Sequence, residues 1–125
     1  MDASSPEAID FAAAVLALRR DGGIAALPKG ARLPRLDGFT IGVWETDVGA
    51  PHGGELHPDG DEFLFLIEGR LDVRLGEGEE ATHLSVEAGQ GCVVPRGVWH
   101  KVTPVGRCRI LFMTPGPAIE FRPPA

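Results

Sequence analysis

The sequence GGELHPDGDEFLFLIEG, residues 53–69, carries three side chains of metal-binding type within eight positions of one another. Glu55 and His57 are two residues apart, so in a strand they project from the same face. Residues 58–61, PDGD, are typical of a turn, which lets the chain reverse and brings Glu62 back beside them. The pattern predicts that three potential ligands converge at one place.

A second segment, residues 89–100, reads GQGCVVPRGVWH and ends on a fourth potential ligand, His100. Its apolar residues 92–94 indicate a buried strand, and Pro95 with Gly97 indicates a turn that ends this strand. The segment therefore presents a histidine directly after a proline turn.

Together the two segments resemble the paired motifs of the cupin superfamily, and the resemblance covers roughly residues 40–115. In the first motif, three or four residues separate a histidine from a glutamate, and six further residues separate that glutamate from a glycine; four and six intervening residues are present here. The second spaces a glycine, a proline, a glycine and a histidine in the same way as residues 89–100. The matching positions are His57, Glu62, Gly69, Gly89, Pro95, Gly97 and His100.

Two positions depart from the family pattern. Glu55 stands where the family has its first histidine, and Pro104 stands where it has an asparagine. The three-histidine, one-glutamate site of the family is therefore not carried over whole. The resemblance implies a metal site made of His57, Glu62 and His100, with Glu55 as its fourth member.

Strand signals recur at short intervals through most of the chain, and they favour an all-β fold. The expected strands cover residues 39–46, 62–67, 71–75, 83–86, 92–94 and 108–113. Many short strands between Gly, Pro and Asp turns are typical of a β-sandwich or barrel, a class that includes jelly rolls. With the resemblance, the fold class expected is a double-stranded β-helix, or jelly-roll barrel, preceded by one short α-helix.

That helix is predicted from about Pro6 to Arg20. Ser5 supplies a capping oxygen, Pro6 suits the first helical position, and Gly22 with Gly23 ends the helix. Residues 24–36 carry two prolines and indicate irregular or edge structure. We expect residues 1–36 to form a helix and an irregular arm packed on the barrel, and residues 37–125 to form the barrel itself.

Composition and charge restrict the kinds of partner and the cellular location that are expected. The net charge of −6 argues against nucleic-acid binding, which depends on clustered Lys and Arg. No apolar run reaches the roughly 18 residues needed to cross a bilayer, and the N-terminus lacks the order of a secretory signal. Cys92 and Cys108 lie in apolar segments, which fits a reduced, cytoplasmic protein. Short jelly-roll chains expose sheet edges and apolar faces, so a homodimer is expected.

Two histidines and a carboxylate form the ligand set of many divalent first-row ions, which predicts Fe, Mn, Ni or Zn at His57, Glu62 and His100. The alternative is that these histidines only form hydrogen bonds in a polar barrel mouth. Glu55 is a fourth ligand, a partner that orients His57, or a general base and thus a catalytic residue. Because protonated imidazole cannot ligate, binding should fade below about pH 6.5.

The other candidate residues are expected to have structural or surface roles rather than functional ones. His52 lies out of phase with Glu55 and is expected at the pocket rim, unless a bulge turns it inward. His83 is expected at the surface. Trp44 and Trp99 are expected to fill core or rim, and Arg96 and Lys101 are expected to be solvated charges rather than anion ligands.

The sequence thus predicts a metal-binding, single-domain cupin that acts on a small oxygen-bearing metabolite. Isomerase, dioxygenase and decarboxylase chemistry stay open, because a fold does not identify a reaction. The alternative function is a non-catalytic module that binds a small ligand or a metal as a sensor or carrier.

Overall fold

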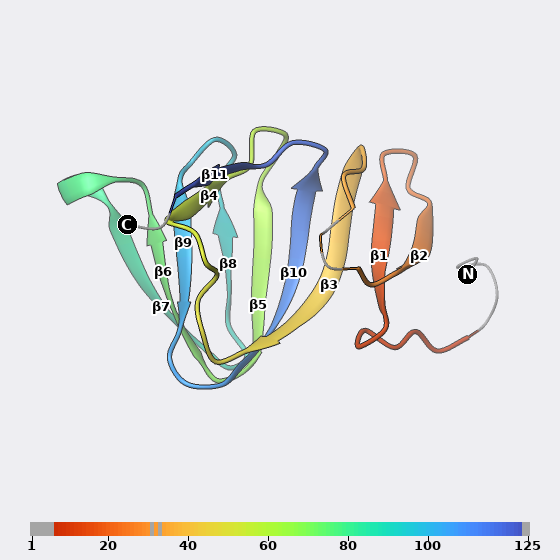
Figure 1. Cartoon of the computed structure of the whole chain (residues 1–125), viewed down its shortest axis with the longest axis horizontal. Coiled ribbons are helices and arrows are strands. Elements are labelled where there is room, and N and C mark those ends of the chain that lie inside the picture. Colours follow the sequence, from red (N-terminus) through yellow and green to blue (C-terminus); the bar gives the residue numbers. More distant parts are fainter. Residues whose placement is uncertain (1–6, 31, 33, 124–125) are drawn as a thin grey trace.

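The computed structural model describes residues 7–30, 32 and 34–123 as two antiparallel sheets that enclose a common interior (Figure 1). The order of the first sheet is β2 (Ile24–Pro28), β1 (Ala14–Arg19), β3 (Gly38–Thr46), β10 (Cys108–Gly116), β5 (Glu62–Glu68) and β8 (Gly91–Val94). The order of the second is β11 (Glu120–Arg122), β4 (Gly54–Leu56), β9 (His100–Pro104), β6 (Arg70–Leu75) and β7 (Thr82–Glu87). The predicted jelly-roll class and its expected strands are confirmed.

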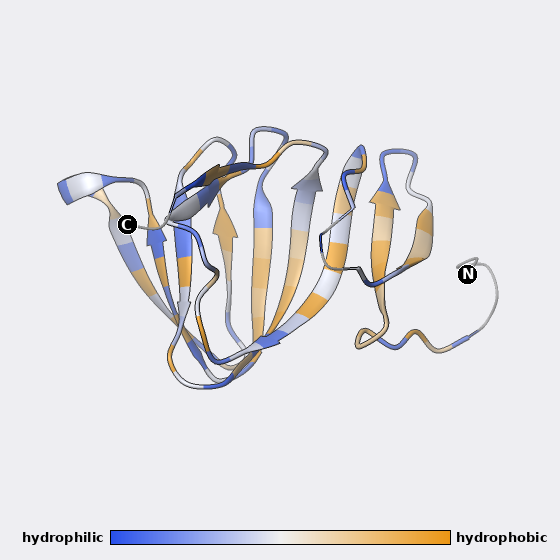
Figure 2. Ribbon diagram, in the orientation of Figure 1, coloured by the Kyte–Doolittle hydropathy of each residue, from blue (hydrophilic) through white to orange (hydrophobic). Residues whose placement is uncertain are grey.

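The core lies between the sheets and is built by alternate residues of their strands. Leu64 and Leu66 of β5 face Leu71 and Val73 of β6, and all four are buried. Each such side chain contributes about 1.5–3 kcal/mol when it is fully buried. The apolar bands on β5, β8 and β10 stand out by colour (Figure 2). Hydrophobic burial therefore holds the two sheets together.

Gly69 closes the tight connection between β5 and β6. Its φ of 95° lies in the left-handed region that side chains with a Cβ rarely adopt. A Cβ there would also collide with the backbone oxygen of Arg107. The glycine of the first motif is thus required by the backbone of this turn.

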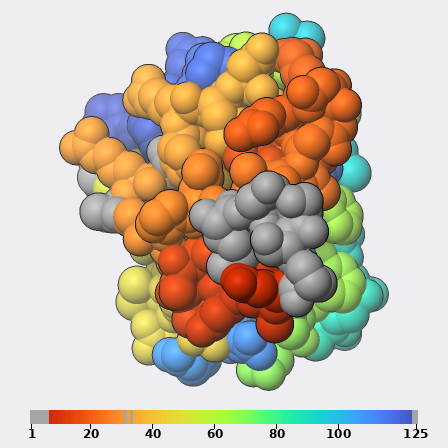
Figure 3. All heavy atoms as spheres, turned by 90° about the vertical axis from the view of Figure 1, so that its right-hand side faces the viewer, coloured from red at the N-terminus to blue at the C-terminus, as the bar shows by residue number. Residues whose placement is uncertain are grey.

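The predicted N-terminal helix is wrong for the residues that are described. Residues 14–19 form β1, which pairs with β2 as a hairpin and with the edge of β3. The red and orange atoms of this N-terminal part make up much of the face shown in Figure 3. Val15 and Ala17 are buried at alternate positions, so the segment has strand periodicity. Gly22, with φ 89°, serves the hairpin turn rather than a helix end. Pro6 and Ser5, the proposed helix start, lie outside the described residues.

Tertiary pairing explains this difference. β3 would otherwise expose a row of backbone donors and acceptors, and β1 satisfies them along four residue pairs. This gain outweighs the helix propensity of an alanine-rich segment, which amounts to tenths of a kcal/mol per residue. Within the described residues, the helical structure is limited to a 3₁₀ turn at Gly78–Glu80. No helix among them has the length and apolar character to span a bilayer.

Candidate metal centre

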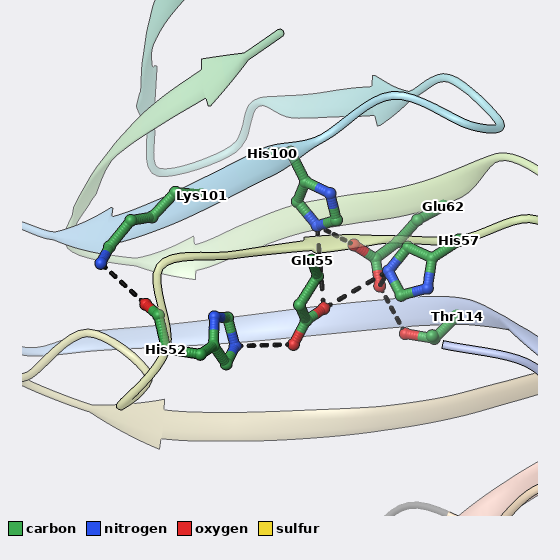
Figure 4. A network of polar contacts seen from close by, with 7 residues as sticks. All are labelled: His52, Glu55, His57, Glu62, His100, Lys101 and Thr114. Carbon is green, nitrogen blue, oxygen red and sulfur yellow. Dashed lines mark hydrogen bonds and ion pairs between the residues drawn. The ribbon is translucent and has the colours of Figure 1, made fainter. Parts of the chain in front are cut away.

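The four predicted side chains come from three neighbouring parts of the fold. Glu55 lies on β4, His57 directly after it, Glu62 starts β5 and His100 starts β9 (Figure 4). β4 pairs with β9 so that Glu55 lies directly opposite His100. The turn at residues 58–61 returns the chain to Glu62. The expectation that these residues share one end of the fold is confirmed.

The polar atoms of the four side chains face one another. His57 Nε2 lies 3.4 Å from Glu55 Oε2 and 3.3 Å from Glu62 Oε2. His100 Nε2 lies 3.2 Å from Glu62 Oε1 and 3.8 Å from Glu55 Oε2. One ligand atom from each residue can be chosen so that all four lie within 4.8 Å of one another.

Burial divides the group into three enclosed members and one open member. His57, Glu62 and His100 are at most 5% exposed, whereas the side chain of Glu55 is 26% exposed. Charged groups are almost never buried to this degree without partners. The two carboxylates and two imidazoles are therefore mutually dependent, and Glu55 is the member nearest to solvent.

The close contacts shift two pKa values in opposite directions. Burial by itself lowers the pKa of His57, but the close polar contacts and negative charges of Glu55 and Glu62 outweigh it and raise that pKa to about 9. Burial by itself raises the pKa of Glu62, but His100 and His57 outweigh it and lower that pKa to about 2. At neutral pH, His57 is protonated and Glu62 is ionised when no metal is bound.

Two further residues hold the carboxylates, and sequence reasoning missed the first. Thr114 Oγ1 donates a hydrogen bond to Glu62 Oε2 at 2.6 Å. Thr114 has the inward phase of Ile110 and Phe112 on β10, and a polar residue in that phase was the available signal. His52 Nε2 donates to Glu55 Oε1 at 2.9 Å. His52 thus lies beside the four residues, as expected for a residue at the rim of the pocket, and contacts one of them, Glu55.

The arrangement fits a divalent ion on two observations. Atoms bound to one ion at about 2.0–2.2 Å lie about 3.0–3.5 Å apart, close to most of the separations found between these imidazole and carboxylate atoms. His57 Nε2 is also buried without a hydrogen-bond partner among the described residues, although it points at two carboxylates. Nitrogen and oxygen donors of this kind suit Fe, Mn, Ni and Zn.

A cavity of about 270 Å³ adjoins the four-residue group and is lined by three of its members. Trp44, Leu64, Val102 and Phe112 give it apolar walls, while Glu55, Glu62 and His100 line its polar end. The rim is completed by Lys29 and Arg32, from a segment that the sequence did not associate with the site. Such a space, lined by apolar side chains with a few convergent polar groups, is typical of a ligand site.

Apart from Trp44, the remaining candidates are absent from the lining of the cavity. Arg96 donates to the carbonyl of Pro58, and Lys101 Nζ donates to the carbonyl of His52 at 2.9 Å. Trp99 lies under the guanidinium of Arg122, with 4.3 Å between that group and the ring centre. His83 is exposed on β7. Of the two tryptophans, Trp44 is the one that lines the cavity.

Solved structures share this fold at low sequence identity. A conserved protein of unknown function from Streptococcus pyogenes is 23% identical, with a TM-score of 0.55 over 69% of this chain and 70% of that one. An oxalate oxidase is 21% identical, with a TM-score of 0.55 over 70% and 51%. Hydroxypropylphosphonic acid epoxidase from S. wedmorenis is 21% identical, with a TM-score of 0.52 over 61% and 42%.

A curated relative and a family model also match the sequence. The uncharacterized protein YrkC of Bacillus subtilis (strain 168) is 32% identical over 72 residues, which are 54% of this chain and 38% of the relative. The chain therefore matches well under half the length of that relative. A family model described as Cupin domain matches residues 42–114, more than half of the chain and all of the strands that carry the four residues. The chain belongs to the cupin family.

Proposed function

We propose that this chain is a metal-dependent cupin that acts on a small oxygen-bearing molecule. One divalent first-row transition ion, Fe, Mn, Ni or Zn, is held by Glu55, His57, Glu62 and His100. The observation that carries this proposal is the convergence of four ligand atoms within 4.8 Å at the inner end of a cavity. The reaction class, whether isomerase, dioxygenase or decarboxylase, is left open.

The structures of similar fold support the metal rather than the reaction. Hydroxypropylphosphonic acid epoxidase has been solved with Fe(II) and with Co(II) and substrate, so this fold can combine a divalent ion with a small substrate. At identities below 25%, these proteins share the fold with this chain, and a fold hosts many reactions. Their substrates are therefore not assigned here.

Each residue has a distinct part in the proposed site. A bound ion would polarise an oxygen atom of the substrate. His57 and His100 present Nε2 to the centre from buried positions. Glu55 presents Oε2, while its Oε1 is engaged by His52, so the carboxylate is held as a ligand rather than free as a base. The apolar walls exclude water around the reacting end of a bound molecule.

A second candidate function is a non-catalytic module that binds a metal or a small ligand. One observation favours it. Among the described residues that line the cavity, every carboxylate and imidazole belongs to the four-residue group or, like His52, contacts it. No carboxylate or imidazole independent of this group is left there for proton transfer, so turnover would have to use the group itself, Lys29 or water.

The test is metal analysis of the full chain with a matched pair of histidine variants. We expect about one ion per chain for the unchanged protein and for His83→Ala, because His83 is exposed and remote. His57→Ala should lose most of the metal, because it removes a buried ligand. Equal metal content in both variants, or no affinity of any of them for Fe, Mn, Ni or Zn, would reject the proposed function.

The chain is further proposed to work as a homodimer on a small-molecule ligand. The outer face of the six-stranded sheet supports this, because one row of paired residues crosses five strands and is apolar throughout. The row is Leu16, Ile41, Met113, Phe63 and Val93. Both cysteines are free thiols, which accords with the cytoplasmic setting expected from the sequence.

A further inference from the structure

The cavity has two ends of different charge, and the outer end is built by residues outside the family match. Lys29 and Arg32 line the cavity and are exposed, so they lie at its rim. They belong to the segment after β2, whereas the Cupin domain model matches residues 42–114. This rim is therefore a feature of this chain rather than of the shared domain.

The positive charge at the rim has no carboxylate partner among the described residues. Lys29 Nζ donates to the backbone oxygens of Val43 at 3.1 Å and Phe11 at 3.4 Å. These bonds hold the ammonium in place, leave one of its three donors over and compensate none of its charge. Other cations of the chain do pair, as Arg20 does with Asp37. Several other cations, such as Arg19 and Arg35, also lack an ion pair among the described residues, so what distinguishes Lys29 and Arg32 is that both line the mouth of this cavity.

The end of the cavity at the proposed metal centre cannot supply a net positive charge for an anionic ligand. Glu55 and Glu62 bring two negative charges, which a divalent ion with two neutral imidazoles would only balance. A glutamate in the place of the family's first histidine thus leaves the proposed metal centre neutral. Attraction for an anionic ligand must then come from Lys29 and Arg32, across the apolar stretch formed by Trp44 and Phe112.

We infer that the cavity binds a small amphipathic organic acid, with its acid group at Lys29 and Arg32 and an oxygen-bearing end at the four-residue group. The volume of about 270 Å³ is near the lower end of ligand sites and restricts the ligand to a short chain or a single ring. The position of the oxygen-bearing end rests on the proposed function. The position of the acid group rests on the two cations alone.

A pair of matched probes tests the charge preference: 6-hydroxyhexanoate and its uncharged amide, 6-hydroxyhexanamide. Calorimetric titration of the full chain should show roughly three- to twentyfold tighter binding of the acid, the range that two partly exposed ion pairs provide. Salt should reduce this ratio by screening. In the Trp99→Phe variant, Trp44 is the sole tryptophan, and its fluorescence should respond to the probe because it lines the cavity.

Substitutions of Lys29 and Arg32 test whether these two residues cause the preference for the acid over the amide. Lys29→Gln and Arg32→Gln should each lower the ratio of acid to amide affinity, and together they should bring it close to one. Arg35→Gln is the control, because Arg35 is an exposed cation of the same segment that does not line the cavity. Arg32→Gln alone suffices if Lys29→Gln fails to fold. An unchanged ratio in the double variant, equal binding of both probes, or no binding of either would overturn the inference.

The same ratio, measured in the metal-free His57→Ala variant, separates the two proposals. If the preference for the acid persists there, the rim acts independently of the ion. If the unchanged protein binds no metal yet prefers the acid, the proposed function fails and the assignment of the acid group stands. If metal is bound but the preference vanishes when the ion is removed, the acid binds the ion and the assignment of the rim is wrong.

Discussion

Glu55 divides its two carboxylate oxygens between different neighbours. Oε1 accepts a hydrogen bond from His52, and Oε2 faces His57 and His100. This division favours a ligand whose orientation is fixed from outside, as is common around metal sites. The sequence left three roles open for Glu55, and the contact with His52 supports our proposal that Glu55 is a ligand.

Substitution of Glu55 separates these roles. Glu55→Ala should lower metal affinity by more than about 100-fold, beyond the roughly 10- to 100-fold that follows from loss of an orienting residue. Glu55→His should restore binding and raise the relative affinity for Ni or Zn, because imidazole is the softer donor. Metal titrations of both variants and of Glu55→Gln provide the measurement. Retention of near-normal affinity by the Ala variant would assign Glu55 to orientation or proton transfer.

The pKa of His57 makes metal affinity depend on pH over a higher range than the sequence suggests. An unperturbed histidine gives a limit near 6.5, whereas this one has a pKa of about 9 in the metal-free protein. Below that value, an ion must displace a proton from His57, so apparent affinity should rise about tenfold per unit up to about pH 9. Titrations at pH 6, 7, 8 and 9 check this slope. A plateau that begins near 6.5 would contradict it.

The stability of the metal-free chain should fall toward pH 9, whereas metal affinity rises over the same range. The pKa of His57 is raised from 6.5 to about 9, so its contribution is full below 6.5 and is lost as pH rises through 9. The pKa of Glu62 is lowered from 4.5 to about 2, so its contribution is full above 4.5 and is lost as pH falls through 2. Urea unfolding of the chelator-treated protein should therefore give the largest contribution from this pair between about pH 4.5 and 6.5. Bound metal should remove the decline toward pH 9.

At the scale of the elements, the pairing of β3 with β10 shapes the cavity wall. Gly42 lies opposite Phe112, and a Cβ at this position would approach the phenyl ring to 2.5 Å. The glycine thus lets Phe112 lie flat on its neighbouring strand and keeps the ring at the side of the cavity. The space for a ligand beside Phe112 therefore depends on the absence of a side chain at Gly42.

Gly42→Ala should destabilise the chain by about 1–3 kcal/mol, because overpacking forces side chains from their preferred positions. It should also weaken binding of a cavity probe, since Phe112 has to move. Gly49→Ala is the control, because the nearest atom to its Cβ would be 3.8 Å away and its φ is unstrained. Urea unfolding compares the two variants. Similar stability of both would show that the ring moves at no cost.

At the scale of the whole molecule, the six-stranded sheet has an apolar outer face. Phe63 and Phe65 on β5 project there and are half-buried, next to Leu111 and Met113 of β10. Arg109, also on β10, forms ion pairs with Glu45 and Glu68, which gives this region a charged border. An apolar centre with a polar rim is the usual composition of a subunit interface.

Light scattering should therefore report a dimer at micromolar concentration. Phe65→Glu should produce a folded monomer, because it places a charge in the centre of the proposed interface without altering the buried side of β5. Val48→Glu should leave the dimer intact, since Val48 is an exposed loop residue. A monomeric unchanged protein, or a dimeric Phe65→Glu variant, would refute this use of the face.

The sequence by itself determined the fold class, the four residues of the candidate metal centre, and the strands β3, β5, β6, β7, β8 and β10. These features are local, because alternation places Glu55 and His57 on one face and short turns return Glu62 and His100 to the same end. A few residues of separation encode the approach of Glu55, His57 and Glu62. His100 lies 38 positions beyond Glu62 and was placed by the resemblance of its segment to the second family motif. The division of the chain into residues 1–36 and 37–125 stays a prediction.

Only the tertiary structure decided the features that join distant segments. It made residues 14–19 a strand, β1, rather than the expected helix. Pairing with β3 satisfies the backbone donors and acceptors along that edge, whereas a helix would leave them without partners in the sheet. It brought Thr114 to Glu62 across 52 positions and placed Lys29 and Arg32, rather than Arg96 and Lys101, at the cavity. Strand pairing between remote segments depends on the whole sheet, so no local pattern of residues specifies it.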